Sequence, residues 1–341
     1  MATATRMRAV LLKTPGPASN LHLVELPIPR PTNGQVLIRV KAFGLNRSEL
    51  LTRRFGRAPV GPVQLPRVLG VEAAGVVEAA PGYENEFPKG AIVMTAVGGM
   101  GIVFDGGYAE YTCVPKANVQ VLQSGAEELG WELLGALPEM LQTAHGCLFR
   151  SLKIKAGDSL LIRGGTTSVG LAAAAIAHNA GATVITTTRK SDEATAHMLR
   201  DNGADHIVVD DGSSVSQAVQ RLQPSGVDKV LELIGATTLV ESLSLLNKDG
   251  ICCLVGLVGG SHLVADFNPL AMIQTERYLT AYGERNFAAS NLPLDELIQQ
   301  IKDGSLKIHT GKVFQMTQIV EAHEYMENNE SNGKIVVLTG M

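Results

Sequence analysis

The stretch LLIRGGTTSVGLAAAAIA, residues 160–177, constrains the fold more than any other part of the chain. A short apolar run, a glycine-containing turn and an alanine-rich segment predict a strand, a tight turn and a helix. In a G-x-G-x-x-G fingerprint, glycines would occupy positions 165, 167 and 170, but Thr167 stands in the middle. The stretch is therefore either a dinucleotide site with an altered middle position or merely a tight turn.

The residues that follow favour the dinucleotide site. Six β-like runs alternate with helical stretches near residues 191–201, 214–223 and 237–247, which predicts an α/β fold with a doubly wound parallel sheet. The runs are DSLLIRG, TVITTT, HIVVD, DKVLELIG, GICCLVG and RYLTAYG. A strand precedes the turn and a helix follows it, with a further strand within about thirty residues, as the fingerprint requires.

The rest of the chain differs in pattern. The first 120 or so residues contain short apolar runs separated by Pro, Gly and Asn, which predict a β-barrel or sandwich. After about residue 284, two helical segments, LDELIQQIKDG and QIVEAHEYMEN, precede a last strand in GKIVVLTG. We expect this tail to rejoin the first domain.

Composition excludes several classes of protein. A length of 341 residues suits two domains, and 45% hydrophobic with 18% charged residues suits a well-packed α/β protein. The net charge of −4, with both signs interspersed, predicts neither a nucleic-acid surface nor a polybasic membrane surface. No segment reads as a signal peptide or a membrane span, and the four cysteines form no C-x-x-C pair. We expect a soluble cytoplasmic protein with reduced thiols.

The turn and the next strand predict which cofactor binds. Gly165 would make the tight turn and Gly170 would let helix and strand pack closely. A helix N-terminus favours an anion, so the hydroxyls and N–H groups there would hold a pyrophosphate. The residues are Thr166, Thr167, Ser168, Val169 and Gly170.

The next strand predicts whether the cofactor is NAD or NADP. An NAD site requires an acidic residue about 20 residues after the glycines. Here Thr188, Arg189 and Lys190 suit a 2′-phosphate instead, the alternative being a solvated basic loop. NADPH is favoured.

Taken together, these segments resemble the medium-chain dehydrogenase/reductase superfamily, specifically its zinc-free quinone oxidoreductase and enoyl reductase branch. The resemblance covers almost the whole chain and includes AFGLNRSELLTR, LPRVLGVEAAGVVEAAPG, GGYAEYTCVP, GADHIVVD and EAHEYMENNESNGKIVVL. It implies a GroES-like β-barrel domain of residues 1–127 and 284–341, and a Rossmann NADPH-binding domain of residues 128–283. Nicotinamide and substrate would lie in the cleft between the domains.

The same resemblance predicts that no metal binds. Zinc-dependent members carry an early cysteine, a His–Glu pair and a later Cys or Asp. Here the early loop is GLNRSEL, Val71 precedes Glu72, and LPEMLQTAHG offers no thiol. A catalytic zinc site needs about three protein ligands, and no such set stands at the motif positions. Without a Lewis acid, hydride addition to a quinone or a conjugated C=C bond is easier to support than alcohol oxidation.

The expected activity is therefore NADPH-dependent reduction of a small-molecule quinone or α,β-unsaturated carbonyl compound, including enoyl thioesters. The alternative is a crystallin-like protein that binds NADPH without turnover, because Leu51 stands where the family often has a tyrosine. The resemblance places Asn46 near nicotinamide and substrate, where it could otherwise be a turn residue. Thr143 would lie near the nicotinamide amide or be a helix-interior hydroxyl. Tyr282 and His145 are acid candidates, and Tyr108 is expected in the barrel core.

Further cofactor contacts are expected where strands end, because open α/β sheets bind ligands at their carboxyl edges. Gly235 would approach the adenosine side, and the residues after the fifth strand would approach the nicotinamide: Gly256, Leu257 and Val258. Lys334 matches a basic residue that reaches the cofactor from the tail. Its alternative is a surface lysine.

The last strand of the sheet, in RYLTAYG, predicts the assembly. It has no proline and no charge after Arg277, so its edge is poorly protected if exposed. Family members pair such edges across a two-fold axis, which implies a homodimer joined by residues 250–283. The alternative is that residues 261–276 cover the edge of a monomer.

Overall fold

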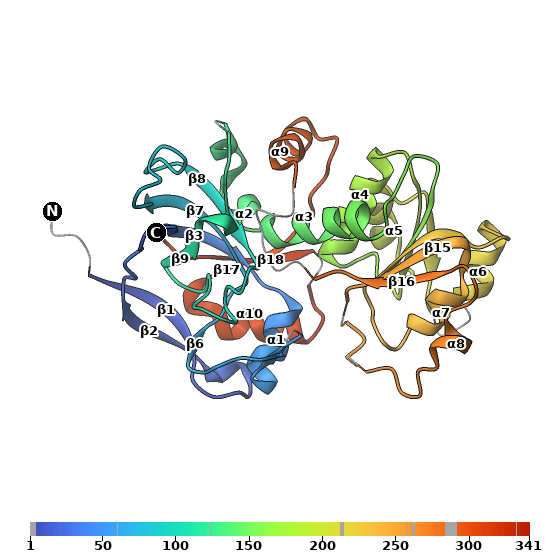
Figure 1. The fold of residues 1–341 in the computed structure, drawn as a ribbon, viewed down its shortest axis with the longest axis horizontal. Helices are drawn as coiled ribbons and strands as arrows, with labels where there is room; N and C mark the ends of the chain where they lie inside the picture. Colours follow the sequence, from blue (N-terminus) through green and yellow to red (C-terminus); the bar gives the residue numbers. More distant parts are fainter. Residues whose placement is uncertain are drawn as a thin grey trace. The chain divides into compact units, whose positions relative to one another are not determined.

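The structure is a computed structural model that describes residues 5–59, 61–123, 125–211, 215–256, 258–260, 263–283, 292–331 and 333–341. The chain divides into two compact units (Figure 1). Unit 1 comprises Met1–Gln142, Glu284–Ile298 and Thr310–Met341, and unit 2 comprises Thr143–Gly283 and Gln299–His309. A compact unit need not be an independently folding domain, so the domain boundaries 127/128 and 283/284 stay predictions.

Unit 1 is built on a seven-stranded sheet in the order β10-β8-β7-β3-β18-β17, with β9 also paired to β3. Its central strand β3 runs antiparallel to both β7 and β18, so the end of β3 meets the beginnings of the other two. The strands are β3 (Gln35–Gly44), β7 (Glu72–Ala79), β8 (Ile92–Ala96), β9 (Tyr111–Pro115), β10 (Val119–Val121), β17 (Thr310–Gln315) and β18 (Lys334–Leu338).

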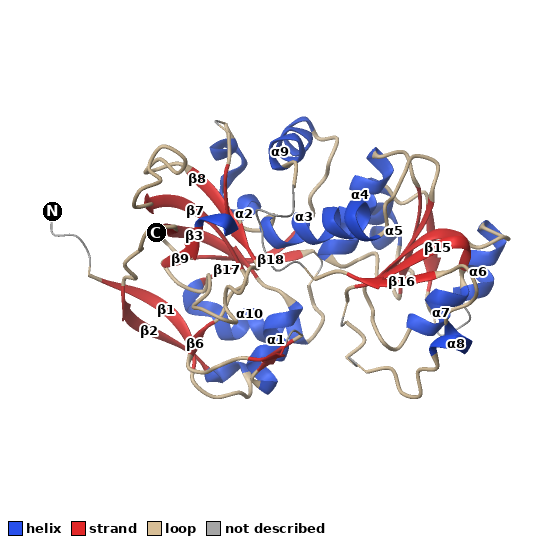
Figure 2. Cartoon of the chain, viewed as in Figure 1, coloured by secondary structure: helices blue, strands red, loops and turns tan. Residues whose placement is uncertain are grey.

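Smaller elements complete unit 1 (Figure 2). A three-stranded sheet joins β1 (Arg6–Leu12), β2 (Leu21–Pro27) and β6 (Arg67–Val68), and a two-stranded one joins β4 (Arg57–Ala58) and β5 (Gly61–Pro62). The helices are α1 (Arg47–Phe55), α2 (Gly130–Leu134) and α10 (Ile319–Glu327), with 3₁₀ turns at Ala18–Asn20, Lys116–Asn118, Ala126–Leu129 and Met316–Gln318. The unit division falls inside α3 (Pro138–His145) and α9 (Leu294–Asp303).

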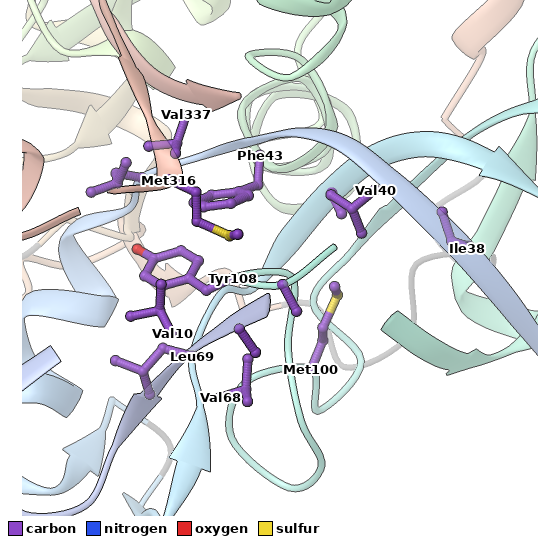
Figure 3. Packing of buried hydrophobic residues seen from close by; sticks show 14 of the residues in the cluster. Val10, Ile38, Val40, Phe43, Val68, Leu69, Met100, Tyr108, Met316 and Val337 are labelled. Atoms are coloured by element: carbon purple, nitrogen blue, oxygen red, sulfur yellow. The ribbon is translucent and has the colours of Figure 1, made fainter. Parts of the chain in front are cut away.

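Tyr108 lies in the core of unit 1, as expected from the sequence. Figure 3 shows its ring among Val10, Phe43, Leu69 and Met316. The Tyr108 and Phe43 rings stack with centroids 4.6 Å apart, and the Tyr108 side chain is fully buried. The core of this unit therefore includes a phenolic hydroxyl that needs a hydrogen-bond partner.

Unit 2 is a six-stranded sheet in the order β13-β12-β11-β14-β15-β16, and every pairing is parallel. The strands are β11 (Ser159–Arg163), β12 (Thr183–Thr188), β13 (His206–Val209), β14 (Val227–Glu232), β15 (Leu246–Leu254) and β16 (Tyr278–Ala281). The helices are α4 (Ser168–Asn179), α5 (Glu193–Asp201), α6 (Val215–Leu222), α7 (Leu239–Ser244) and α8 (Pro269–Met272). This is the doubly wound Rossmann order, so the prediction of an α/β fold with a doubly wound parallel sheet is confirmed.

The edge strand β16 is partly covered. Val264, Phe267 and Ile273 pack against the core of unit 2 together with Leu279, whereas Leu270 is 96% exposed and Tyr278 53% exposed. Within the described part of the chain, no helix is long and apolar enough to cross a membrane.

Candidate active site

The glycine turn lies where the strand order of unit 2 reverses. It follows β11, whose neighbours β12 and β14 lie on opposite sides, and the crevice at such a switch point is where doubly wound sheets bind ligands. The positive φ of the turn falls on Gly164, at 86°, rather than on Gly165. A Cβ on Gly165 would lie 2.7 Å from the Thr186 Cβ, so that glycine allows close packing against β12. The turn itself depends on Gly164.

Thr167, at the altered middle position, is the N-cap of α4. Its Oγ1 accepts a hydrogen bond from the Gly170 N–H at 3.0 Å and donates to the Gly164 carbonyl at 2.9 Å. A Cβ on Gly170 would lie 2.6 Å from that carbonyl, so this glycine allows the helix to approach the turn rather than the strand. Thr167 thus rigidifies the turn.

The start of α4 suits a diphosphate. Residues 166–169 are all half-buried, and the first N–H groups of a helix have no partner within it. Such groups, together with the helix dipole, form an anion site. The hydroxyls of Thr166 and Ser168 add neutral donors at the same helix end. The residues present therefore fit the pyrophosphate of a dinucleotide.

The end of β12 lies beside the glycine turn. Thr187 Oγ1 accepts a hydrogen bond from the Gly164 N–H at 3.1 Å, and Thr188 Oγ1 accepts one from the Lys190 N–H at 3.1 Å. Arg189 and Lys190 are exposed. The first acid after β12 in the sequence, Asp192, caps α5 by accepting a hydrogen bond from the Thr195 N–H at 2.8 Å. The chain therefore presents cations after β12, while its first carboxylate is engaged in the helix cap.

The turns after β14 and β15 pack against each other. Glu232 accepts hydrogen bonds from the N–H groups of Ile234 and Gly235, at 2.8 and 3.0 Å. A Cβ on Gly256 would overlap the Leu233 carbonyl, so only glycine allows this approach. Val258 is half-buried. Leu257, a predicted cofactor contact, lies outside the described residues.

Two of the predicted catalytic residues, Thr143 and Tyr282, belong to unit 2. Thr143 lies in α3, which continues into a π-helix at Gly146–Ser151, a rare form often found at functional sites. Tyr282 follows β16, and a Cβ on Gly146 would overlap its phenolic oxygen. The structure thus brings Tyr282 against the helix that carries Thr143. The ring of His145 packs against that of Phe149 in a tilted arrangement, with centroids 4.6 Å apart.

Asn46, the predicted catalytic residue of unit 1, lies in a buried charged cluster. Its Nδ2 donates to Glu72 Oε1 at 2.8 Å, and its Oδ1 accepts from Lys334 Nζ at 2.6 Å. Lys334 Nζ is also 2.7 Å from Glu72 Oε1 and 3.5 Å from Glu139 Oε2. Lys334 was expected either at the cofactor or at the surface. It is buried, and its ammonium group contacts the side chains of Asn46, Glu72 and Glu139.

The cluster is held at one end of the sheet. Glu72 begins β7, Lys334 begins β18, and Glu139 lies in the first turn of α3, where its N–H donates to Glu72 Oε2 at 2.9 Å. Burial alone would lower the pKa of Lys334, but the carboxylates of Glu72 and Glu139 outweigh it and raise that pKa. Burial raises the pKa of Glu72, and Lys334 offsets part of this. Lys334 is therefore held as a cation.

A second buried group adjoins the first. Glu49 accepts hydrogen bonds from the N–H groups of Asn46 and Val71, at 2.7 and 2.8 Å, and from the hydroxyl of Tyr108. Tyr108 Oη lies 3.1 Å from His323 Nε2. Burial raises the pKa of Glu49 to about 7, and burial with the nearby Arg53 lowers the pKa of His323 to about 3. The imidazole is thus neutral across the physiological range.

Sequence reasoning identified Asn46 but missed most of its surroundings. The residues it overlooked are Glu49, Arg53, Glu139 and His323, and it assigned no role to Glu72. A local signal existed only for Glu49, because Asn followed three residues later by Glu matches a capping pattern. The others are distant in sequence, and no local pattern marks them.

A catalytic zinc ion does not fit the residues of this cluster. At least three His, Cys, Asp or Glu ligands would have to converge, and the residues that the structure describes contain no such group. Glu72 is committed to Lys334 and Asn46, and its neighbour Val71 cannot ligate a metal.

Two family models match the chain. Residues 32–124 match the alcohol dehydrogenase GroES-like domain, and residues 202–337 match a family described as zinc-binding dehydrogenase. The first match lies in unit 1 and includes Asn46 and Glu72. The second includes β14, β15 and the tail up to β18. The first match confirms the prediction of a GroES-like part.

Individual relatives extend over nearly the whole chain. A human quinone oxidoreductase is 28% identical and covers 99% of this chain and 100% of its own length. A 2-haloacrylate reductase from a Burkholderia species is also 28% identical, over 97% of this chain and 98% of its own. The structure is similar to a mycobacterial protein solved in complex with NADPH, with a TM-score of 0.83 and 27% identity, covering 97% of this chain and 99% of that one.

Proposed function

We propose that this chain, whose two parts match dehydrogenase family models, is an NADPH-dependent reductase of quinones or activated C=C bonds, in the quinone oxidoreductase and enoyl reductase branch of the medium-chain dehydrogenase/reductase superfamily. The observation that carries the proposal is the turn after β11, where the half-buried start of α4 offers an anion site at the switch point of the sheet. The substrate class follows from the similarity to a quinone oxidoreductase and a 2-haloacrylate reductase.

A nicotinamide cofactor is supported by the NADPH-bound relative, and the choice of NADPH over NADH is part of the proposal. Ser168, Val169 and Gly170 bind the pyrophosphate in this proposal. Thr188, Arg189 and Lys190 bind the 2′-phosphate in this proposal. Two exposed cations form charge-assisted hydrogen bonds with a 2′-phosphate, and these are stronger than the hydrogen bonds they would form with the 2′-hydroxyl of NADH. Gly235, Gly256 and Val258 complete the contacts.

NADPH, when bound, supplies a hydride to an electron-poor carbon. The displaced electron pair moves onto the carbonyl or quinone oxygen, and a hydrogen-bond donor must stabilise the charge that develops there. Asn46 Nδ2 carries a second N–H, and no described residue accepts it. We assign that N–H to the substrate oxygen. Thr143 orients the nicotinamide amide, and Tyr282 is the candidate donor of the final proton.

We also propose a homodimer joined through residues 250–283. The supporting observations are that β16 is the last strand of its sheet and carries the half-exposed Tyr278, and that Leu270 of α8, also within residues 250–283, is exposed. An uncovered edge strand favours pairing with another copy. The packing of Val264, Phe267 and Ile273 supports the monomeric alternative only in part.

Anaerobic assays with purified protein test the function. NADPH oxidation is followed with a quinone, an enone and an enoyl thioester, each beside a reaction that lacks protein. We expect at least one acceptor to be reduced with a turnover number above about one per second. If none consumes NADPH above background while NADPH quenches protein fluorescence, the chain is a binding protein and the proposal is wrong.

A further inference from the structure

We propose that Lys334 and Glu72 are positioning residues, which lock the carboxamide of Asn46 in the one orientation that offers an N–H to the substrate oxygen. This inference rests on the proposed reductase function. Its evidence is separate, because it comes from the contacts of Asn46 within unit 1.

The chemistry of the two partners decides the orientation of the amide. An ammonium group can only donate hydrogen bonds, and an ionised carboxylate can only accept them. Lys334 therefore selects the Oδ1 end of Asn46 at 2.6 Å, and Glu72 selects the Nδ2 end at 2.8 Å. A flipped amide would face each charge with the wrong atom, so both hydrogen bonds would become repulsive.

The same contacts polarise the amide. A cation on the carbonyl oxygen draws electron density from the amide nitrogen, and this strengthens the remaining N–H as a donor. Because Lys334 Nζ also lies 2.7 Å from Glu72 Oε1, the three side chains form a closed triangle. Lys334 and Glu72 are 2% and 0% exposed, so water screens these interactions very little.

The backbone is shaped for this triangle. A Cβ on Gly44, the last residue of β3, would overlap both Lys334 Cε and Glu72 Oε1. Strand pairing sets the position, because Gly44 is opposite Val336 in β18. The other oxygen of Glu72 accepts the Glu139 N–H at 2.9 Å, where the N-terminus of α3 favours a negative charge. Every polar atom of the Glu72 carboxylate is thus occupied.

Stability alone does not account for such a group. Buried ion pairs lose their hydration, and apolar residues of similar volume are often as stabilising or more so. A structural position at the end of three strands would be filled as well by apolar side chains. The buried charged triangle is explained if it serves to fix and polarise the Asn46 N–H that contacts the substrate oxygen.

A double-mutant cycle tests the inference. Lys334→Met and Asn46→Ala are each expected to lower kcat for acceptor reduction at least tenfold. The double variant should be no slower than Asn46→Ala alone, because Lys334 acts only through that amide. The Kd for NADPH should stay within twofold of wild type. Independent, multiplicative losses in kcat would overturn the proposal, as would a Kd that rises while kcat is unchanged, since Lys334 would then serve the cofactor.

A spectroscopic measurement makes the inference separable from the proposed function. In protein labelled with ¹⁵N-asparagine, the Asn46 Nδ2 resonances are assigned by their loss in Asn46→Ala. We expect a downfield, exchange-protected proton in wild type that moves upfield in Lys334→Met. An unchanged resonance overturns the positioning role even if the enzyme is active. An inactive wild-type protein with the expected spectra overturns the reductase function alone.

Two further variants guard against misfolding. Lys334→Met leaves Glu72 as an unpaired buried charge, so the charge-balanced Lys334→Met/Glu72→Gln is measured beside it. Gly44→Ala keeps every charge and displaces the pair, and it should shift the same resonance and lower kcat. Lys13→Met is the matched control, because Lys13 is an exposed lysine of the same unit, and its kcat and spectra should equal wild type.

Discussion

Tyr108 donates its hydroxyl proton to Glu49 Oε2 at 2.5 Å, in the buried interior of unit 1. Because that hydroxyl is used as a donor, the Nε2–H of His323 donates to the same oxygen from 3.1 Å. His323 Nδ1 finds no partner among the described residues. A directed chain of hydrogen bonds thus runs from the imidazole to the carboxylate, and it ties two titrating groups to the stability of the unit.

His323→Gln is expected to reduce the loss of unfolding free energy that occurs as the pH falls below 6.5. The folded pKa of His323, about 3, lies below its ordinary value of 6.5, so below pH 6.5 the unfolded chain binds a proton that the folded one does not. Stability is therefore lost as the pH falls from about 6.5 towards 3, by at most about 1.4 kcal/mol per pH unit. Urea unfolding at pH 7, 6 and 5 measures this, and parallel curves for variant and wild type would contradict it.

Glu49→Gln is expected to reduce the loss of stability that occurs as the pH rises. The folded pKa of Glu49, about 7, lies above its ordinary value of 4.5 because of burial. The contribution of this carboxyl group to the free energy of unfolding is complete below pH 4.5 and is lost as the pH rises through 7. The wild type should therefore lose more stability than Glu49→Gln between pH 5 and 8. The test compares the two slopes in urea rather than the absolute values, because the substitution also disturbs hydrogen bonds.

Arg189→Ala/Lys190→Ala should weaken NADPH binding selectively. Each charged contact to a phosphate contributes roughly 1.5–3 kcal/mol, so the affinity should fall at least tenfold, while NADH binding should barely change. Fluorescence titration with both cofactors gives the two Kd values. Equal losses for both would mean that the adenosine pocket lies elsewhere.

Gly146→Ala should displace Tyr282, because the added methyl group would overlap the phenolic ring. Overpacking of this kind costs about 1–3 kcal/mol. The cost should shrink in a Tyr282→Ala background, where the methyl group has room. Thermal unfolding of the four proteins in this cycle gives the coupling, and additive effects would show that the two residues do not meet.

Light scattering at micromolar concentration should give twice the 36.1 kDa of one chain. Tyr278→Lys, which places a charge on the edge strand β16, should shift the protein towards the monomer. Val103→Lys is the control, because Val103 is 74% exposed and lies outside residues 250–283. A wild-type mass near that of one chain would rule out the homodimer.

The sequence predicted the parallel sheet because alternation of apolar runs and helices is a local property. It did not predict β17, since TGKVFQ has a single adjacent pair of apolar residues and becomes a strand through pairing with β18. The surroundings of Asn46 were equally hidden. Glu72 and Lys334 are brought together only by the pairing of β7 and β18 with β3, and pairing over such distances leaves no mark in the local pattern.

The position of β18 has a consequence for synthesis on the ribosome. β18 lies between β3 and β17 in the sheet of unit 1, although β3 is made some three hundred residues earlier. A nascent chain can assemble the parallel sheet of unit 2 as soon as β16 emerges, whereas the end of β3, Ala42–Gly44, lacks its β18 partner until residues 334–338 have been translated. During that interval Glu72 has no ammonium partner. The sheet that begins first is therefore completed last, and the unpaired end of β3 is a site at which an incomplete chain can associate with others.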